Sequence, residues 1–171
     1  ANDVNDCNYW LSNGSGDGFS SHMQPAAQVK AVANARVERG MRVVCVEPRL
    51  SVAGAKADEW VPIRPASDKF FALGLCHVMV REKLYDVAFL KKDTNAPYLV
   101  GADGYFVRDA QGQVYVWDAL DNKPKLWRDA TVKDWALEGE YQVDGVTCKP
   151  AFQLFREILE VFFVIHDPTT F

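Results

Sequence analysis

The hydrophobic positions in the first part of the chain alternate between helical spacing and short continuous apolar runs. Alanine and valine recur every three or four positions from Pro25 to Arg39, which predicts a helix. Met41–Val46 is apolar except for Arg42, and such an unbroken run is typical of a strand covered on both faces. With Cys7–Leu11 as a short first strand, this order predicts a right-handed strand–helix–strand unit.

The following segment predicts a third strand and two more helices. Glu59–Ile63 is strand-like and ends before Pro65, and Ser67 is expected to be the N-cap of a helix that runs to about Lys83. Apolar side chains surround almost the whole of this helix, which predicts that it is deeply buried. A shorter helix is expected near Asp86–Lys91.

After Pro97 the pattern changes to short strand-like runs separated by turn residues. Asp103-Gly104, Gln111-Gly112 and Asp144-Gly145 are typical of tight turns. The runs between them predict a region rich in β-hairpins. These runs are Tyr98–Val100, Tyr105–Val107, Val114–Trp117, Tyr141–Val143 and Val146–Cys148.

These patterns predict an α/β protein that forms one domain over residues 1–171. Residues 1–97 are the expected core with parallel strands, and residues 98–148 are a hairpin-rich insertion. Residues 149–171 hold a last helix, about Pro150–Glu160, and an apolar, β-prone tail, Val161–Ile165. Such a tail must be buried or it promotes self-association.

Composition and charge narrow the classes of function. The 171 residues carry a net charge of −4 without a basic stripe, which argues against a nucleic acid polymer as partner. No apolar run reaches the roughly 18 residues of a membrane span. No signal peptide pattern is present, so the cytoplasm is the default expectation. The four cysteines form no C-x-x-C pair, which favours free buried thiols over a metal site.

Polar residues at the ends of two strands and at the start of a helix are candidates for a ligand site, because open α/β sheets bind ligands there. The loop Gly14-x-Gly16-x-Gly18 could hold a phosphate or be a plain flexible loop. Glu47 could bind ribose hydroxyls or be a solvated strand-end residue, and Arg49 could hold a phosphate or only pair with Glu47. Asp68 suits the helix dipole and could also accept two N–H bonds from guanine. No catalytic pair follows from the spacing, which suggests a binding domain.

Three segments together resemble the catalytic subunit of the dimethyl sulfoxide reductase family of molybdenum/tungsten oxidoreductases. They are Tyr9–Gly14, Arg42–Arg49 and Ala57–Asp68, within a wider resemblance from about Cys7 to Leu159. The resemblance implies a Rossmann-like, three-layer domain that binds the guanosine and pyrophosphate of molybdopterin guanine dinucleotide. It also implies that the metal ligand and the iron–sulfur cysteines lie outside this chain, which is expected to be a fragment.

The resemblance implies cofactor-binding roles for six residues at the pyrophosphate, the ribose with its nearby phosphate, and the guanine base. In that order they are Ser12, Asn13 and Gly14, then Glu47 and Arg49, and finally Asp68.

Two residues depart from the family pattern. Glu47 stands where the family has aspartate before Pro-Arg, and its side chain reaches further. Ala66 stands where the family has the glycine of Pro-Gly-Thr-Asp, and its Cβ hinders close approach to the backbone. From about Glu160 the sequence no longer resembles the family.

Three functions stay open at this point. The chain could be the cofactor-binding part of an oxidoreductase, not catalytic alone, with the remaining domains or subunits as partners. It could instead be a stand-alone or relic protein that folds and self-associates without a ligand. A third possibility is a module that binds guanine nucleotides. Only a retained guanine site would depend on the Asp68 carboxylate.

Overall fold

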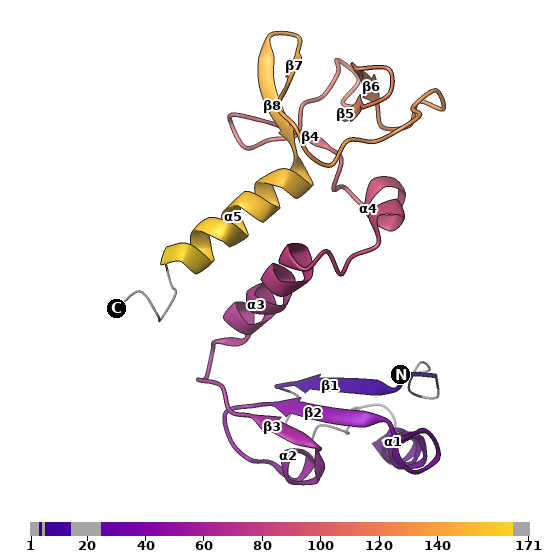
Figure 1. Cartoon of the computed structure of the whole chain (residues 1–171), viewed down its shortest axis with the longest axis vertical. Helices are drawn as coiled ribbons and strands as arrows, with labels where there is room; N and C mark the ends of the chain where they lie inside the picture. The colour runs from indigo at the N-terminus through magenta and orange to yellow at the C-terminus, as the bar shows by residue number, and fades with distance from the viewer. Residues whose placement is uncertain (1–3, 5, 15–24, 166–171) are drawn as a thin grey trace. The chain divides into compact units, whose positions relative to one another are not determined.

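The computed structural model describes residues 4, 6–14 and 25–165, and the chain divides into two compact units, Ala1–Ala72 and Leu73–Phe171 (Figure 1). The first unit holds a parallel sheet and the second holds antiparallel hairpins. The predicted α/β class is therefore confirmed. The organisation of residues 1–171 as one domain stays a prediction.

The first unit is built on a three-stranded parallel sheet in the order β1-β2-β3. Asn13 is in register with Val46, and Val46 is in register with Val61, so the carboxyl ends of all three strands lie in line. Helix α1 connects β1 to β2, and the short helix α2 lies between β2 and β3. The elements are β1 (Tyr9–Asn13), α1 (Pro25–Arg39), β2 (Arg42–Val46), α2 (Val52–Lys56) and β3 (Glu59–Val61).

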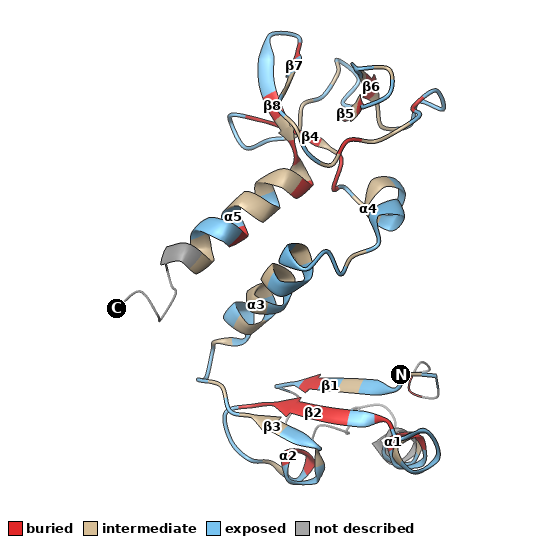
Figure 2. Cartoon of the chain, in the orientation of Figure 1, coloured by how far each residue is buried: buried red, intermediate tan, exposed pale blue. Residues whose placement is uncertain are grey.

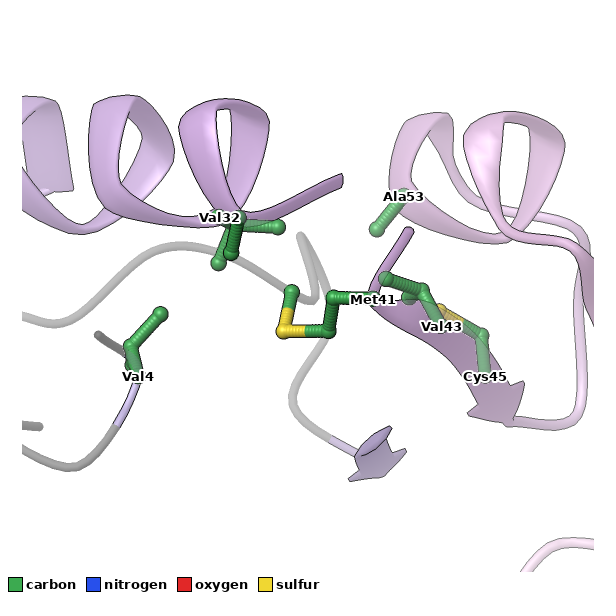
Figure 3. Packing of buried hydrophobic residues seen from close by; sticks show 7 residues of the cluster. Val4, Val32, Met41, Val43, Cys45 and Ala53 are labelled. Atoms are coloured by element: carbon green, nitrogen blue, oxygen red, sulfur yellow. The ribbon is translucent and has the colours of Figure 1, made fainter. Parts of the chain in front are cut away.

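An apolar core joins β2 to the two helices of this unit (Figure 3). Val43 and Cys45 project from β2 toward Val32 of α1 and Ala53 of α2, and all four are buried. The whole of β2 after Arg42 is buried, as its unbroken apolar run predicts (Figure 2). This core fixes β2, and the candidate site lies at the carboxyl end of that strand.

The second unit consists of two small antiparallel sheets with helices at either end of its sequence. Strands β4, β8 and β7 form one sheet in that order, and β5 pairs with β6. Helix α3 begins in the first unit and ends in the second. The elements are α3 (Asp68–Arg81), α4 (Val87–Asp93), β4 (Leu99–Gly101), β5 (Tyr115–Asp118), β6 (Lys123–Leu126), β7 (Tyr141–Val143), β8 (Val146–Pro150) and α5 (Ala151–Ile165).

The predicted hairpin between β7 and β8 is confirmed. Asp144 and Gly145 have φ values of 49° and 81°, the positive pair that a two-residue type I′ turn requires. Strand β6 was not predicted, because Lys123, Pro124 and Lys125 interrupt its apolar pattern. Lys125 nevertheless faces the interior, where it pairs with a buried aspartate.

Two predictions about helices are wrong. Helix α5 continues to Ile165, so the expected β-prone tail is helical, because its apolar residues extend the spacing of the preceding turns. No residue of α3 is buried, and Phe70, Leu75 and Val78 are exposed. An apolar helix is buried only where another layer covers it, and α5 covers α3 only in part: the rings of His77 and Phe163 stack at 4.4 Å, and other residues of α3 are at most half-buried. Ser67 precedes α3 as expected, but its hydroxyl donates to the Arg64 carbonyl.

A buried ion pair fixes the β5–β6 hairpin. The Lys125 ammonium donates to Asp118 Oδ2 at 2.7 Å, to Asp121 Oδ2 at 2.6 Å and to the Thr131 carbonyl at 2.6 Å. Asp118 Oδ2 also accepts from the Lys133 N–H at 2.9 Å. Burial opposes ionisation of Asp118, but the hydrogen bonds from Lys125 and the backbone outweigh burial and hold its pKa well below the usual range.

Replacement of Asp118 by asparagine should lower the free energy of unfolding by about 3 kcal/mol at pH 7, because Lys125 keeps only Asp121 as a charged partner. A depressed folded pKa stabilises the protein above the unfolded pKa of about 3.9. This contribution is lost as the pH falls toward the folded pKa. The difference between wild type and variant should therefore narrow below about pH 4.

Urea denaturation followed by circular dichroism at pH 7 and pH 3 measures this difference. Asp144→Asn is the matched control, because it replaces an exposed aspartate at a φ that asparagine tolerates. Equal stability of the two variants at pH 7 would show that the ion pair between Asp118 and Lys125 does not stabilise the fold.

Candidate functional site

The candidate site lies at the carboxyl ends of β1 and β2. Asn13 ends β1, and the N–H of Gly14 donates to the Val46 carbonyl at 2.9 Å, so the turn after β1 lies beside the end of β2. Glu47 directly follows β2, and Arg49 is two residues further on. The sheet thus brings together five of the six predicted residues. Gly16 and Gly18 of the predicted phosphate loop lie outside the described residues.

Asp68 lies close to Gly14. A Cβ on Gly14 would be 3.4 Å from Asp68 Oδ1, and Gly14 has a φ of 64°. A side chain at position 14 would therefore be strained by the positive φ, and its Cβ would contact the carboxylate. Asp68 is exposed in the first turn of α3, so its carboxylate is open to a ligand next to the backbone of Gly14.

The hydroxyl of Ser12 is directed into the fold. Ser12 is buried and hydrogen-bonds the thiol of Cys45, its register partner on β2. Burial and the Glu47 carboxylate raise the pKa of Cys45, although the bond to Ser12 opposes them. Cys45 is therefore a protonated, unreactive thiol. The prediction of buried free thiols is confirmed for Cys45 and Cys148, whereas the free thiols of Cys7 and Cys76 are only partly buried.

Glu47 is turned inward rather than toward solvent. Only 5% of the residue is exposed, and its Oε1 accepts a hydrogen bond from Ser51 Oγ at 2.5 Å. The alternative of a solvated strand-end glutamate is therefore wrong. Arg49 is exposed, and no ion pair joins it to Glu47 among the described residues, so simple pairing of the two is wrong as well.

Sequence reasoning did not identify the three residues that surround Glu47. Ser51 is the N-cap of α2, and Trp60 Nε1 donates to the Glu47 carbonyl at 3.2 Å. A Cβ on Gly54 would lie 2.8 Å from Glu47 Oε1, so any larger residue at this position would displace the carboxylate. The available signal in the sequence was the pair Ser51 and Gly54 in the small-residue stretch that follows Glu47.

Ala66 adopts the conformation that glycine prefers. Its φ is 65°, two residues before Asp68. This chain therefore adopts the left-handed conformation with alanine at this position. The cost is about 1–2 kcal/mol for a residue with a Cβ.

Other parts of the described chain offer less for ligand binding. No group of three His, Cys, Asp or Glu residues in the described ranges could hold a metal ion. A pocket of about 380 Å³ lies within residues 73–171, but its charges are largely paired, as in Arg156 with Glu138 at 2.5 Å. Across residues 25–165, no helix is long and apolar enough to cross a membrane.

Comparison with known proteins decides the family. A family model described as molybdopterin oxidoreductase matches residues 21–154, which include Glu47, Arg49 and Asp68. The chain belongs to the molybdopterin oxidoreductase family. The resemblance found in the sequence is therefore confirmed.

Several relatives in this family are parts of larger oxidoreductases. A sulfite dehydrogenase subunit of Allochromatium vinosum is 36% identical over 72% of this chain and 14% of its own length. A putative dimethyl sulfoxide reductase catalytic subunit of Halobacterium salinarum is 32% identical over 69% of this chain and 15% of its own length. The alpha subunit of dimethylsulfide dehydrogenase of Rhodovulum sulfidophilum is 33% identical over 68% of this chain and 15% of its own length. The chain thus spans about 15% of the length of these curated relatives.

Ala66→Gly should raise the free energy of unfolding by about 0.5–1 kcal/mol, because relief of the left-handed strain exceeds the entropy gained by the unfolded chain. Thermal and urea denaturation measure the change. Ala66→Val is the control and should destabilise the protein, since a β-branched residue fits a positive φ poorly. Unchanged or lower stability of the glycine variant would contradict the account of this turn.

Proposed function

We propose that residues 1–72 bind the guanosine diphosphate end of molybdopterin guanine dinucleotide for an oxidoreductase. The observation that carries this proposal is the position of the exposed Asp68 carboxylate next to the backbone of Gly14, at the carboxyl edge of a parallel sheet. Family membership supports a molybdopterin cofactor. The Asp68 carboxylate supports the guanine dinucleotide form of this cofactor.

The chemistry of the described residues fits such a group. A carboxylate accepts two N–H bonds from the N1 and N2 donors of guanine, whereas adenine does not offer this pair of donors. The start of α3, a helix of 14 residues, adds the positive end of its dipole near the base. The N–H of Gly14 is already bound to Val46, so this glycine contributes space and not a hydrogen bond.

The phosphates would be held by groups that remain accessible. Arg49 is exposed and carries a fixed positive charge, and the exposed Asn13 offers an amide that can donate. When bound, the cofactor would supply the redox chemistry at its metal. The residues of this chain would recognise the nucleotide and hold it in place, so we infer no catalysis by the chain alone.

Calorimetric titration with GDP, and with ADP as comparison, tests the guanine site. GDP should bind more tightly than ADP. Asp68→Ala should weaken GDP binding by about 1.5–3 kcal/mol, the value of a hydrogen bond to a charged group. Glu82→Ala is the control, because it removes an exposed carboxylate just beyond the other end of α3.

The outcomes separate a retained guanine site from a protein without a ligand. GDP binding that depends on Asp68 supports such a site, which the cofactor-binding part and the guanine-nucleotide module both require. Binding of GDP as tight as wild type in Asp68→Ala would contradict the role of this carboxylate. The absence of GDP binding by a folded protein would favour the relic.

We also propose that the chain self-associates through one face of α5. Phe155, Ile158 and Val161 lie three residues apart on this helix and are 38%, 64% and 57% exposed. A row of exposed apolar side chains is unfavourable in water and is typical of an interaction surface. A second copy offers the same apolar row and is the occupant that we propose.

Ile158→Glu should convert a self-associated wild type to a monomer, because the buried charge would lack a partner. Sedimentation equilibrium over a range of protein concentrations measures the mass. Val37→Glu is the control, because Val37 is an exposed apolar residue of α1, outside the proposed face. A wild type that stays monomeric, or a Val37→Glu variant that dissociates equally, would overturn the proposal.

A further inference from the structure

We infer that Glu47 is a positioning residue: with Ser51 it closes the loop that carries Arg49, and Arg49 makes the contact with the ligand's phosphate. The loop closure follows from the geometry of the chain itself. The contact by Arg49 rests on the proposed function.

Glu47 is held at three points, all within the first unit. Its N–H donates to the Val61 carbonyl at 3.2 Å, and its carbonyl accepts from Trp60 Nε1 at 3.2 Å. Its carboxylate accepts from Ser51 Oγ at 2.5 Å. Both the backbone and the side chain of Glu47 therefore fix the chain directly after β2. Because its carboxylate is already bound, Glu47 has little freedom to reach a ligand.

Ser51 links this carboxylate to the start of α2. Its hydroxyl donates to Glu47 and at the same time accepts from the Gly54 N–H at 3.1 Å. A hydroxyl has one donor and two acceptor sites, so both bonds can form together. Since a Cβ at Gly54 would come within 2.8 Å of Glu47 Oε1, glycine is needed for the carboxylate to take this position.

The bond between Glu47 and Ser51 closes a short loop in which Arg49 is the central residue. Pro48 restricts the backbone on one side of Arg49, and the N-cap of α2 fixes it on the other. The side chain of Arg49 stays exposed. The backbone of the loop is thus held at both ends. The charged side chain of Arg49 remains accessible to a ligand at the same sheet edge as Gly14.

The first test needs no ligand and uses trypsin, which cleaves after arginine. Ser51→Ala and Glu47→Ala should speed cleavage between Arg49 and Leu50 by about tenfold, because a lost bond to a charged group raises the open population by at least this factor. Glu47→Gln should restore slow cleavage, since its amide oxygen still accepts from Ser51. Cleavage after Arg42, at the start of the buried strand β2, requires global opening and should stay much slower than cleavage after Arg49 in every variant.

The second test is a double-mutant cycle on GDP binding. Ser51→Ala should weaken binding severalfold in the wild type but not in an Arg49→Ala background, because Ser51 acts through Arg49. Its effect should add to that of Asp68→Ala. Glu47→Gln should recover the affinity that Glu47→Ala loses.

Each result decides a separate point. Unchanged cleavage after Arg49 in both alanine variants overturns the loop closure, whether or not GDP binds. A full effect of Ser51→Ala in the Arg49→Ala background overturns the action through Arg49, and so does an affinity of Glu47→Gln as low as that of Glu47→Ala. GDP binding that does not depend on Asp68 contradicts the proposed function alone, because the trypsin result still decides the closure.

Discussion

The parallel pairing of β1 with β2 is the constraint on which the candidate site depends. This register ends with Asn13 opposite Val46 and continues through the hydrogen bond from the Gly14 N–H to the Val46 carbonyl. It places a turn after one strand beside a loop after the next, although many residues separate them in the chain. The apolar core of β2 against α1 and α2 maintains this pairing, so the packing of Val43 and Cys45 determines where the polar residues lie.

The accuracy of sequence-based prediction followed the physical origin of each pattern. The unbroken apolar run of β2 reports burial directly, and the Asp144-Gly145 pair reports a turn geometry, so both were predicted correctly. Strand β6 was not, because the inward-facing Lys125 is stabilised by Asp118, a partner that only the folded hairpin supplies. The burial of α3 was overestimated, because an apolar composition states what a helix can bury but not what covers it.

The candidate site shows the same limit at the level of single residues. Local sequence suggested that Asp68 and Gly14 were both polar-site candidates, but their proximity depends on the fold of the whole first unit. The inward turn of Glu47 depends on the longer glutamate side chain, the hydroxyl of Ser51 and the absence of a Cβ at Gly54. The sequence shows that glutamate replaces aspartate at position 47. Only the structure shows that the longer side chain reaches Ser51.

Together these features support the proposed guanine site in a chain that spans about 15% of the length of its curated relatives. Amide NMR spectra of the ¹⁵N-labelled chain during titration with GDP test this account most directly, because they report each residue separately. We predict that the signals of Gly14 and Asp68 shift more strongly with GDP than with ADP at equal concentration, while those of β5 to β8 stay in place. Shifts confined to residues 73–171, or equal shifts with both nucleotides, would contradict a guanine site at the end of the parallel sheet.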